Sequence, residues 1–468
     1  MSTRIIMVAL VICCVPVKWS TADTIRVPAD FPEIQEALDF AMNGDEVVVA
    51  DGVYVGPGNK DLDFAGKAIT LRSLNGARAC IIDCQNQGRG FYFHNGEGPS
   101  AVVDGFTVRN GRVTLPGLNL GAGIACEGSS PTIRNCRIRN NFVGGNFGAG
   151  GGIFCRGSNA TISNCAITGN QATGTFSNGG GVYVQSGGPT ITDCVITGNM
   201  SGFTGGGVAC TNGCTLHLVG CEVSSNTADF GGAIQCGSNS NPTIERCYIA
   251  LNQAASTAGI LCAASGAPTI SDCAIVGNIS PDQGGAIDCF AKSSPRITRC
   301  TISANDGNGV ACLGGTPTID HCVISGNSDD LAGCVATYSC IGDGDVGLGN
   351  IAGDPQFVSL LDFRLSSSSL CIDAGDPAAA VPEGTQDLDG HSRVLCGGLD
   401  IGAYESGIGD LDCDEAVDLT DFGNWKRCMT GPTGGPYPTD CVALDFDLDD
   451  HIGLRDFASL QNVFTGNP

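Results

Sequence analysis

One segment, Pro-Thr-Ile-x-x-Cys-x-Ile-x-x-Asn, returns many times along the middle of this chain and constrains its fold more than any other feature. A second repeat, Gly-Gly-Gly/Ala-Ile/Val-x-Cys, precedes most of its copies. Repeats of about 20 to 30 residues are typical of solenoids, in which each copy forms one coil and stacks on its neighbours. The first repeat places its cysteine at Cys136, Cys165, Cys194, Cys221, Cys247, Cys273, Cys300 and Cys322.

The residue types inside each repeat predict β-structure. Short runs of Ile, Val and Thr lie between Gly and Asn residues, and the pattern has no helical period. A coil of parallel strands fits this pattern, whereas a leucine-rich or helical repeat does not. We therefore predict an all-β chain whose main domain is a parallel β-helix. Such a rod leaves the function open, because unrelated activities share one fold.

The charge of the chain limits its partners. Its 468 residues include 23 Lys and Arg but 48 Asp and Glu, which makes a formal net charge of −25. We therefore expect no binding to nucleic acid or to a negatively charged membrane surface. An acidic polysaccharide would need bound calcium as a bridge. Such acidity suits a soluble extracellular protein.

Residues 1–22 are predicted to be a secretory signal peptide. Arg4 is its basic end, residues 5–17 are its apolar stretch, and Ser20-Thr21-Ala22 offers a cleavage site. A short membrane anchor is the alternative, but the apolar run is too short to span a bilayer. No other segment is long and apolar enough to be a transmembrane segment. We expect a secreted or cell-surface protein.

The chain has 27 cysteines, and most of them share strand positions with Ile and Val. Because a free Cys packs like a small apolar side chain, we predict two inward-facing ladders of mostly free thiols. Disulfides between neighbouring coils are the alternative. Secretion implies an oxidising environment, and the cysteines off the ladders are the better disulfide candidates. These pairs are Cys371 with Cys396, and Cys428 with Cys441.

A short helix is predicted before the first coils. Asp30-Phe-Pro-Glu33 has the pattern of a capping box, and Ile34, Ala37, Leu38 and Ala41 follow at helical spacing up to Gly44. A solenoid needs such an element to cover its open end. We expect the coils to continue, less regularly, through Cys340 and Phe357 to Tyr404.

Both ends of this region resemble a known superfamily. The opening segment, residues 25–38 with Gly44-Asp-Glu-Val-Val-Val-Ala-Asp-Gly-Val-Tyr54, resembles the entry of right-handed parallel β-helix proteins of the pectin-lyase-like superfamily. Asp387-Leu-Asp-Gly-His-Ser-Arg393 and Asp400-Ile-Gly-Ala-Tyr-Glu405 resemble the closing segment of secreted bacterial β-helix proteins. The resemblance implies a right-handed β-helix over residues 23–405. The superfamily includes lyases, hydrolases, esterases, adhesins and proteins without known activity, so the chemistry stays open.

Regularly spaced acidic residues in the tail predict two calcium-binding loops. Carboxylate oxygens at loop positions 1, 3, 5 and 12, with a backbone carbonyl at position 7, are what a hard cation with six or more oxygen ligands requires. The first loop would bind through Asp410, Asp412, Asp414, Ala416, Asp418 and Asp421. The second loop would bind through Asp445, Asp447, Asp449, His451 and Asp456.

The two loops, each followed by a short helical stretch, resemble a type I dockerin, a small α-helical module of paired EF-hand-like units that docks onto cohesin domains. The resemblance implies calcium as the cofactor, a cohesin-like partner and a module over residues 410–468, after a linker at 406–409. The match is incomplete, because Glu415 and Asp450 replace the usual glycine and Gly453 stands at position 9. Leu419-Thr420 and Leu454-Arg455 also differ from the usual hydroxyl pair. A solvated acidic tail is the alternative.

No catalytic residue is assigned from the sequence, and whether the chain is an enzyme stays open. Enzymes of the superfamily are expected to place charged residues on the outward face of consecutive coils, but the outward positions here are mostly small and uncharged. They offer no pair of acids for glycoside hydrolysis. The residues before the ladder cysteines do carry charge, and Arg246, Asp272 and Arg299 alternate in sign. Ion pairing between coils is the structural interpretation of this column, and a basic residue for a lyase is the functional one.

Three further sets of residues can be interpreted. Two of them have a structural and a functional interpretation, and the third has a structural one alone. Phe147, Phe176, Phe203 and Phe230 would form a platform for sugars if exposed, or part of the core or rim if covered. The recurring asparagines, from Asn141 to Asn327, are predicted to stack as a structural ladder. Another calcium site or a closing turn are the two interpretations of Asp387, Asp389, Asp400 and Glu405.

Two functional hypotheses follow. The first is a secreted or surface β-helix protein whose role is binding or display outside the cell, with an extracellular carbohydrate or a surface partner as its target. This protein would carry a calcium-binding docking module. The alternative is a divergent polysaccharide lyase or glycoside hydrolase tethered through that module. The alternative predicts a cluster of at least one Lys or Arg and one acid in a cleft over neighbouring coils. A purely structural surface rod is a third possibility.

Overall fold

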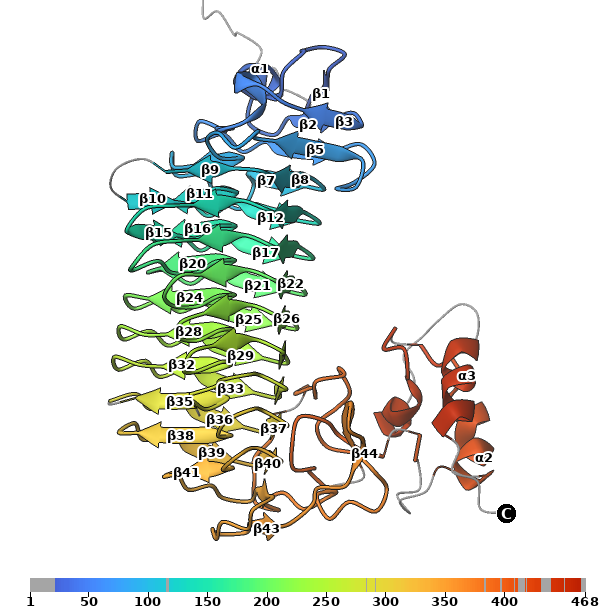
Figure 1. Ribbon diagram of the computed structural model, residues 1–468. Helices are drawn as coiled ribbons and strands as arrows, with labels where there is room; N and C mark the ends of the chain where they lie inside the picture. The colour runs from blue at the N-terminus through green and yellow to red at the C-terminus, as the bar shows by residue number, and fades with distance from the viewer. Residues whose placement is uncertain are drawn as a thin grey trace, which may run out of the picture.

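The computed structural model describes residues 22–114, 118–282, 284–290, 292–382, 384–395, 398–407, 409–410, 417, 419–430, 439–449 and 451–463. Except for Ala22, the predicted signal peptide lies outside them. The described chain forms a long solenoid of parallel sheets, followed by a segment that folds back along it and by a small helical region (Figure 1). No described helix is long and apolar enough to cross a membrane.

Three long parallel sheets build the solenoid, and each strand pairs with the strand one coil further on. Sheet A comprises β1 (Thr24–Val27), β2 (Glu46–Val49), β4 (Thr70–Ser73), β7 (Val102–Asp104), β12 (Thr132–Arg134), β17 (Thr161–Ser163), β21 (Thr190–Thr192), β25 (His217–Val219), β29 (Thr243–Glu245), β33 (Thr269–Ser271), β36 (Arg296–Thr298) and β39 (Thr318–Asp320). It is formed by the Pro-Thr-Ile part of the repeat.

Sheet B follows sheet A after a short turn in each coil and carries the Cys-x-Ile part of the repeat. Its strands are β3 (Gly52–Tyr54), β5 (Cys80–Asp83), β8 (Thr107–Arg109), β13 (Arg137–Arg139), β18 (Ala166–Thr168), β22 (Val195–Thr197), β26 (Glu222–Ser224), β30 (Tyr248–Ala250), β34 (Ala274–Val276), β37 (Thr301–Ser303), β40 (Val323–Ser325), β42 (Cys340–Ile341) and β43 (Ile351–Ala352).

Sheet C carries the second repeat and completes each coil. Its strands are β6 (Phe91–Phe93), β11 (Ile124–Glu127), β16 (Ile153–Arg156), β20 (Val182–Gln185), β24 (Val208–Thr211), β28 (Ile234–Cys236), β32 (Ile260–Cys262), β35 (Ile287–Phe290), β38 (Val310–Leu313) and β41 (Leu331–Ala332). Shorter strands lie between sheets B and C: β9 (Arg112–Val113), β14 (Phe142–Val143), β19 (Gln171–Ala172), β23 (Met200–Ser201), β27 (Thr227–Ala228), β31 (Gln253–Ala254), β10 (Leu118–Leu120) and β15 (Phe147–Ala149).

A helix covers the N-terminal end, as predicted, but its cap differs from the prediction. Helix α1 (Ile34–Phe40) buries Ile34, Ala37 and Leu38 against the first coil. Glu33 is the N-cap residue and makes no side-chain cap hydrogen bond. The Ile34 amide instead donates to Asn59 Oδ1 at 3.0 Å, from the 3-10 helix η1 (Pro57–Asn59). The predicted capping box is therefore not formed, because a residue from the next coil takes its place.

The asparagine ladder is confirmed as a structural element. From Asn141 to Asn305, each side-chain amide donates to the Asn Oδ1 of the next coil, at 2.9 or 3.0 Å, and the last amide, of Asn327, donates to Asp330 Oδ1 at 2.9 Å. A second hydrogen bond from each amide reaches a backbone carbonyl, as Asn226 Nδ2 reaches the Ile196 oxygen at 2.8 Å. The ladder thus pairs polar groups that the tight turns bury.

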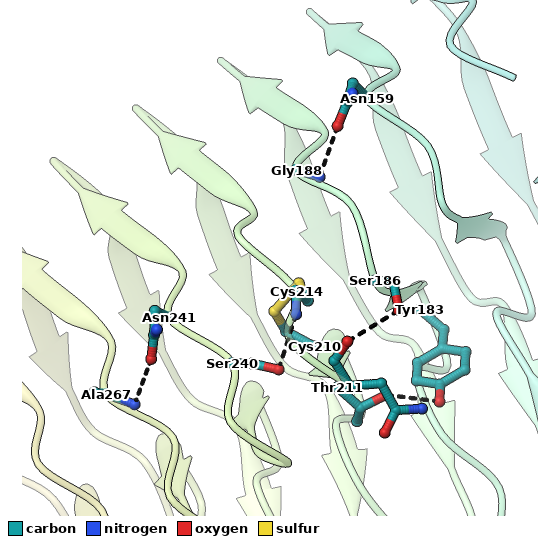
Figure 2. Close-up of a disulfide and its surroundings, with 11 residues drawn as sticks. Asn159, Tyr183, Ser186, Gly188, Cys210, Thr211, Cys214, Ser240, Asn241 and Ala267 are labelled. Carbon is teal, nitrogen blue, oxygen red and sulfur yellow. Dashed lines mark hydrogen bonds between the residues drawn. A yellow bond between two sulfur atoms is a disulfide. The ribbon is translucent and has the colours of Figure 1, made fainter. Parts of the chain in front are cut away.

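Most cysteines line the interior as free thiols, as predicted. Seventeen of the described cysteines are free, and all seventeen are buried. Cys210 and Cys312 keep their register in sheet C but are not free, because they form disulfides with Cys214 and Cys334. Figure 2 shows the Cys210–Cys214 bond, where sheet C turns into sheet A.

The two predicted disulfides outside the ladders have different outcomes. Cys428 and Cys441 are bonded, which confirms the prediction for this pair. Cys371 is free and packs in one apolar cluster with Cys340, so its predicted bond to Cys396 is wrong. Cys396 itself lies outside the described residues. The chain segment that carries Cys371 packs against the last coils, which places Cys371 beside Cys340.

Because the ladder thiols are buried, we expect them to be inert in the folded protein. Burial raises the pKa of the Cys236 thiol to about 12, and the pKa of the Cys80 thiol rises equally far. A disulfide-exchange reagent such as Ellman's reagent, added at pH 8, should therefore release little colour before unfolding. After unfolding in guanidinium without reductant it should titrate at least the seventeen described thiols. Rapid reaction of the folded protein, or few thiols after unfolding, would contradict the free-thiol ladders.

The coils end earlier than predicted. After β43 the chain does not continue the solenoid to Tyr404. It forms the antiparallel pair β44 (Phe357–Ser359) and β45 (Asp362–Leu365) and folds back over sheet B. We call residues 354–405 the closing segment; Figure 1 shows β44 beside the last coils. The reason is apolar packing, because Phe363, Ala403 and Tyr404 cluster with residues of β30 and β34.

Beyond the closing segment lie helices α2 (Leu419–Cys428) and α3 (Leu454–Val463), with the 3-10 helix η2 (Thr439–Leu444) between them. Trp425 of α2 packs on Phe457 of α3, with ring centroids 5.4 Å apart. These residues share a small core with Val417, Cys441 and Leu460. The region therefore has few helices and a core of its own.

Candidate functional site

The closing segment explains why the outward face of sheet B is small and uncharged. Ala250, Ala274 and Val276 are outward residues of β30 and β34, and they are buried under Phe363 and Tyr404. From the sequence, this face offered only small side chains and no pair of acids for glycoside hydrolysis. It is instead the surface on which the returning chain packs.

Two residues of the predicted charged column lie beneath this cover: Asp272 is buried, and the Arg299 side chain is 17% exposed. The Arg299 guanidinium donates two hydrogen bonds to the Asp272 carboxylate, at 2.7 and 2.8 Å. Arg393 of the closing segment is fully buried, and its Nε lies 3.5 Å from Asp272 Oδ1. Ion pairing is therefore the role of Asp272 and Arg299, and neither can form the exposed cluster that a lyase would use.

The other end of Arg393 is held by the acids of the closing segment. Its Nη2 donates to the carbonyls of Asp400 and Gly402 at 3.0 Å each, and its Nη1 lies 3.5 Å from Glu405 Oε2. Burial raises the pKa of Glu405 to about 9, with Arg393 opposing and Asp400 adding to the rise.

The acids predicted for a further calcium site mostly bond to backbone amides. Asp387 accepts from the amides of His391 and Glu405, at 2.7 and 2.9 Å. Asp400 accepts from the amides of Asp373 and Ser406. The arrangement favours the closing-turn interpretation for Asp400 and Glu405. Of the predicted set, Asp387 and Asp389 come together, with His391 beside them.

A cleft opens where the cover of sheet B stops. It holds about 430 Å³, and its walls come from the coils on one side and from the closing segment on the other. Glu222 and Tyr248 are outward residues at the start of β26 and β30, and they pair in register on neighbouring coils. The lining is Asp193, Gly220, Cys221, Glu222, Arg246, Tyr248, Leu388, Asp389, Gly390 and Tyr404.

The cleft has more acidic side chains than basic ones to pair with them. Asp389 is held by Arg364 through two hydrogen bonds, at 2.7 and 2.9 Å. Arg246 lies 4.0 Å from Glu245 and donates to Gln386 of the closing segment. Among the described residues, no cation lies within ion-pair distance of Asp193 or Glu222, and both are exposed. Glu222 accepts a hydrogen bond from the Ser224 hydroxyl at 2.5 Å.

The phenylalanine column lies on the rim of the solenoid and is partly exposed. Phe147 and Phe176 are each 50% exposed, and Phe230 is 36% exposed. Neighbouring ring centroids along the column are 5.5, 6.0 and 5.7 Å apart. The rings therefore pack mainly on one another, which favours the rim interpretation over an open platform for sugars.

The second acidic loop of the tail is described and brings its carboxylates together. Oxygen atoms of Asp445, Asp447 and Asp449 all lie within 4.8 Å of one another. Asp456 accepts hydrogen bonds from the amides of Phe446 and Gly453, both at 2.8 Å. Partial loss of hydration, then the nearby carboxylates of Asp456, Asp449 and Asp445 in that order, raise the pKa of the exposed Asp447, and Arg455 opposes the rise. Crowded carboxylates that repel one another are a donor set suited to a hard cation.

The remaining predicted ligands can be followed only in part. His451 is exposed, and its amide donates to Asp449 at 3.0 Å. From the first loop, Asp410 and Asp421 are described and buried. Asp412, Asp414, Ala416 and Asp418 lie outside the described residues. The second loop also lies near the cleft, because Leu448 is packed so close to Gly390 that a Cβ there would stand 2.7 Å from its Cδ1.

The three parallel sheets define a parallel β-helix protein. The chain matches the family described as "Right handed beta helix region" over residues 48–227, 122–286 and 231–343, and it belongs to that family. No curated protein matches the chain.

Several solved structures are similar in fold. "Crystal structure of pectate lyase Pel9A" is 16% identical, with a TM-score of 0.49 over 82% of this chain and 97% of that chain. "Structure of PL6 family alginate lyase AlyGC" is 13% identical, with a TM-score of 0.36 over 71% of this chain and 53% of that chain. A mannuronic acid-specific family 6 lyase from human gut microbiota is 10% identical, with a TM-score of 0.32 over 73% and 88%. These similarities do not assign an activity.

The cleft itself was missed by reasoning from the sequence. The sequence predicted Arg246 to lie in a charged column, but nothing in it marked Arg246, Glu222 and Tyr248 as neighbours of Leu388 and Tyr404. The signal that could have found them is the closing motif, residues 387–405, whose apolar and aromatic residues need a surface to cover.

Proposed function

We propose that this protein is an extracellular β-helix protein that binds a carbohydrate in the cleft between sheet B and the closing segment. The cleft carries the proposal, because it combines Tyr248 with the polar side chains of Asp193, Glu222 and Arg246. Pockets for small polar ligands pair such an apolar face with a few placed hydrogen-bonding groups. The disulfides and the lyase-like fold support an extracellular location.

Replacing the aromatic wall tests this proposal. Tyr248→Ala removes the ring on which a sugar would pack, and we expect the Kd for a bound oligosaccharide to rise about tenfold. Isothermal titration calorimetry of the full chain against neutral, acidic and basic oligosaccharides gives the measurement. Phe176→Ala, which changes an exposed aromatic residue outside the cleft, is the matched control. Equal loss in both variants, or binding unchanged by Tyr248→Ala, would place the ligand elsewhere.

Cleavage of a polysaccharide is the second candidate function. Arg246 and Glu222 lie in one cleft over neighbouring coils, which is the arrangement that this hypothesis predicts. Against it, Arg246 is engaged by Glu245 and Gln386. Release of unsaturated or reducing ends during the same titrations would establish cleavage, and binding without release would favour recognition alone.

We further propose that the tail binds calcium and docks to a cohesin-like partner. Asp445, Asp447, Asp449 and Asp456 would hold the ion of the second loop, and a bound ion would remove the repulsion among them. Because three of these ligands lie between η2 and α3 and Asp456 lies in the first turn of α3, folding of the helical region should depend on the metal. Docking would then require calcium as well.

Trp425 reports directly on this dependence, because the only other tryptophan, Trp19, lies in the predicted signal peptide. Trp425 is 6% exposed and packs on Phe457. Chelation should therefore shift its fluorescence to longer wavelength while the β-sheet circular dichroism stays, and added calcium should reverse the shift. Asp445→Asn should weaken the response, whereas Asp329→Asn, which changes an exposed acid of the solenoid, should not. An emission spectrum indifferent to chelator would contradict calcium-dependent folding.

A further inference from the structure

The shape of the cleft depends on one glycine. Asp193, Gly220 and Arg246 occupy the same turn position on successive coils, and all three have a left-handed backbone. A Cβ at Gly220 would stand 2.7 Å from Asp193 Oδ1, so any side chain there would fill the space beside that carboxylate. The missing side chain leaves a notch in the column, with an acid at one end and an arginine at the other.

The notch and its surroundings carry a net negative charge. Each arginine near the cleft has an acid beside it: Arg364 pairs with Asp389, and Arg246 Nε lies 4.0 Å from Glu245 Oε1. Asp193 and Glu222 remain as exposed carboxylates without a cation among the described residues. A ligand that carried carboxylates or sulfates would meet this charge, and the net charge of −25 on the whole chain, as repulsion.

The aromatic wall complements a positive charge. Tyr248 stands one coil from Glu222 in direct register, and it is 37% exposed. Burial and the nearby Glu222 charge both raise the pKa of the Tyr248 phenol, so the ring stays neutral. A phenol ring attracts a cation over its face, and a carboxylate beside it accepts hydrogen bonds from an ammonium group.

We propose that the cleft recognises a cationic amino sugar, a glycan unit with a free ammonium group, as in a glucosamine oligomer. This inference rests on the proposed carbohydrate-binding function of the same cleft. The ammonium group sits in the notch at Gly220 and donates to Asp193 and Glu222. The sugar ring packs on Tyr248, and Tyr404 and Leu388 form the opposite wall.

The test compares three oligosaccharides of equal length on the full chain with calcium present: a glucosamine oligomer, its N-acetylated form and a uronic acid oligomer. We expect the glucosamine oligomer to bind most tightly. Glu222→Gln and Asp193→Asn keep the shape of the cleft but remove one charge each, and each should raise the Kd of that oligomer about tenfold. Asp329→Asn, an exposed acid away from the cleft, should leave the Kd unchanged.

The outcomes that would overturn the cationic ligand differ from those that would overturn carbohydrate binding itself. If the N-acetylated oligomer binds equally well and Glu222→Gln has no effect, the cleft binds carbohydrate but the cationic ligand is wrong. Preference for the uronic acid oligomer likewise overturns the inference alone. If none of the three oligomers binds, both the inference and the proposed carbohydrate-binding function fail.

Discussion

Replacing Arg393 with methionine is expected to destabilise the closing segment by about 3–5 kcal/mol, which is the usual cost of removing one partner from a buried ion pair. Arg393 is fully buried, and it joins Asp272 of the coils to Glu405 of the closing segment. Its loss also leaves the carbonyls of Asp400 and Gly402 without a donor from this side chain. The segment should therefore separate from sheet B well before the coils unfold.

Hydrogen exchange and limited proteolysis under increasing denaturant would measure this effect, because they separate local opening from global unfolding. In Arg393→Met, protection should fall across residues 354–405 and persist in the central coils. Arg364→Met is the matched control, since Arg364 is an arginine of the same segment whose side chain is 52% exposed. An exposed ion pair contributes about 1 kcal/mol or less. Equal protection in the two variants would mean that the buried network does not hold the cover.

The second large effect is expected at the centre of the asparagine ladder. Asn226→Leu removes the acceptor of the Asn199 amide groups and the donor to the Ile196 carbonyl and to Asn252. Each buried group left unpaired costs about 1–3 kcal/mol. The variant should therefore lose at least about 3 kcal/mol of unfolding free energy.

Guanidinium unfolding followed by circular dichroism gives the loss for Asn226→Leu, and hydrogen exchange of β22 and β26 locates it. Asn159→Leu is the control, because Asn159 is exposed. This substitution removes only the hydrogen bond that the Gly188 amide donates to Asn159 Oδ1 (Figure 2). In a solenoid each coil contacts only its neighbours, so the damage should stay close to the substituted coil. Uniform loss of protection along the whole rod would show that the ladder acts as a single cooperative unit.

The repeat itself made the solenoid predictable. The Ile and Cys positions of each copy lie inward, and the Asn positions lie in the turns. Stacking of similar coils then brings like residues into register on neighbouring coils. The N-terminal helix was also predictable from its apolar spacing. Its cap was not, because Asn59 reaches Ile34 from a different coil, and no local pattern encodes that contact.

The candidate site was predictable only in pieces. The acidic spacing of the second tail loop predicts a cluster of carboxylates, and Asp445, Asp447 and Asp449 do come together. That pattern is local, since all ligands lie within one loop. The cleft is not local, because Glu222 and Tyr248 meet Leu388 and Tyr404 only after the chain reverses over sheet B.

The sequence by itself thus determined the coil, its inward thiols and its asparagine ladder, because these depend on neighbours one repeat away. Only the tertiary structure decided that the coils stop at β43, that Cys371 lies against Cys340, and that Arg393 is buried. The physical reason is that these features require the closing segment to pack on a particular face of the finished rod. The apolar face of β30 and β34 attracts that segment, and the cleft forms where the face ends.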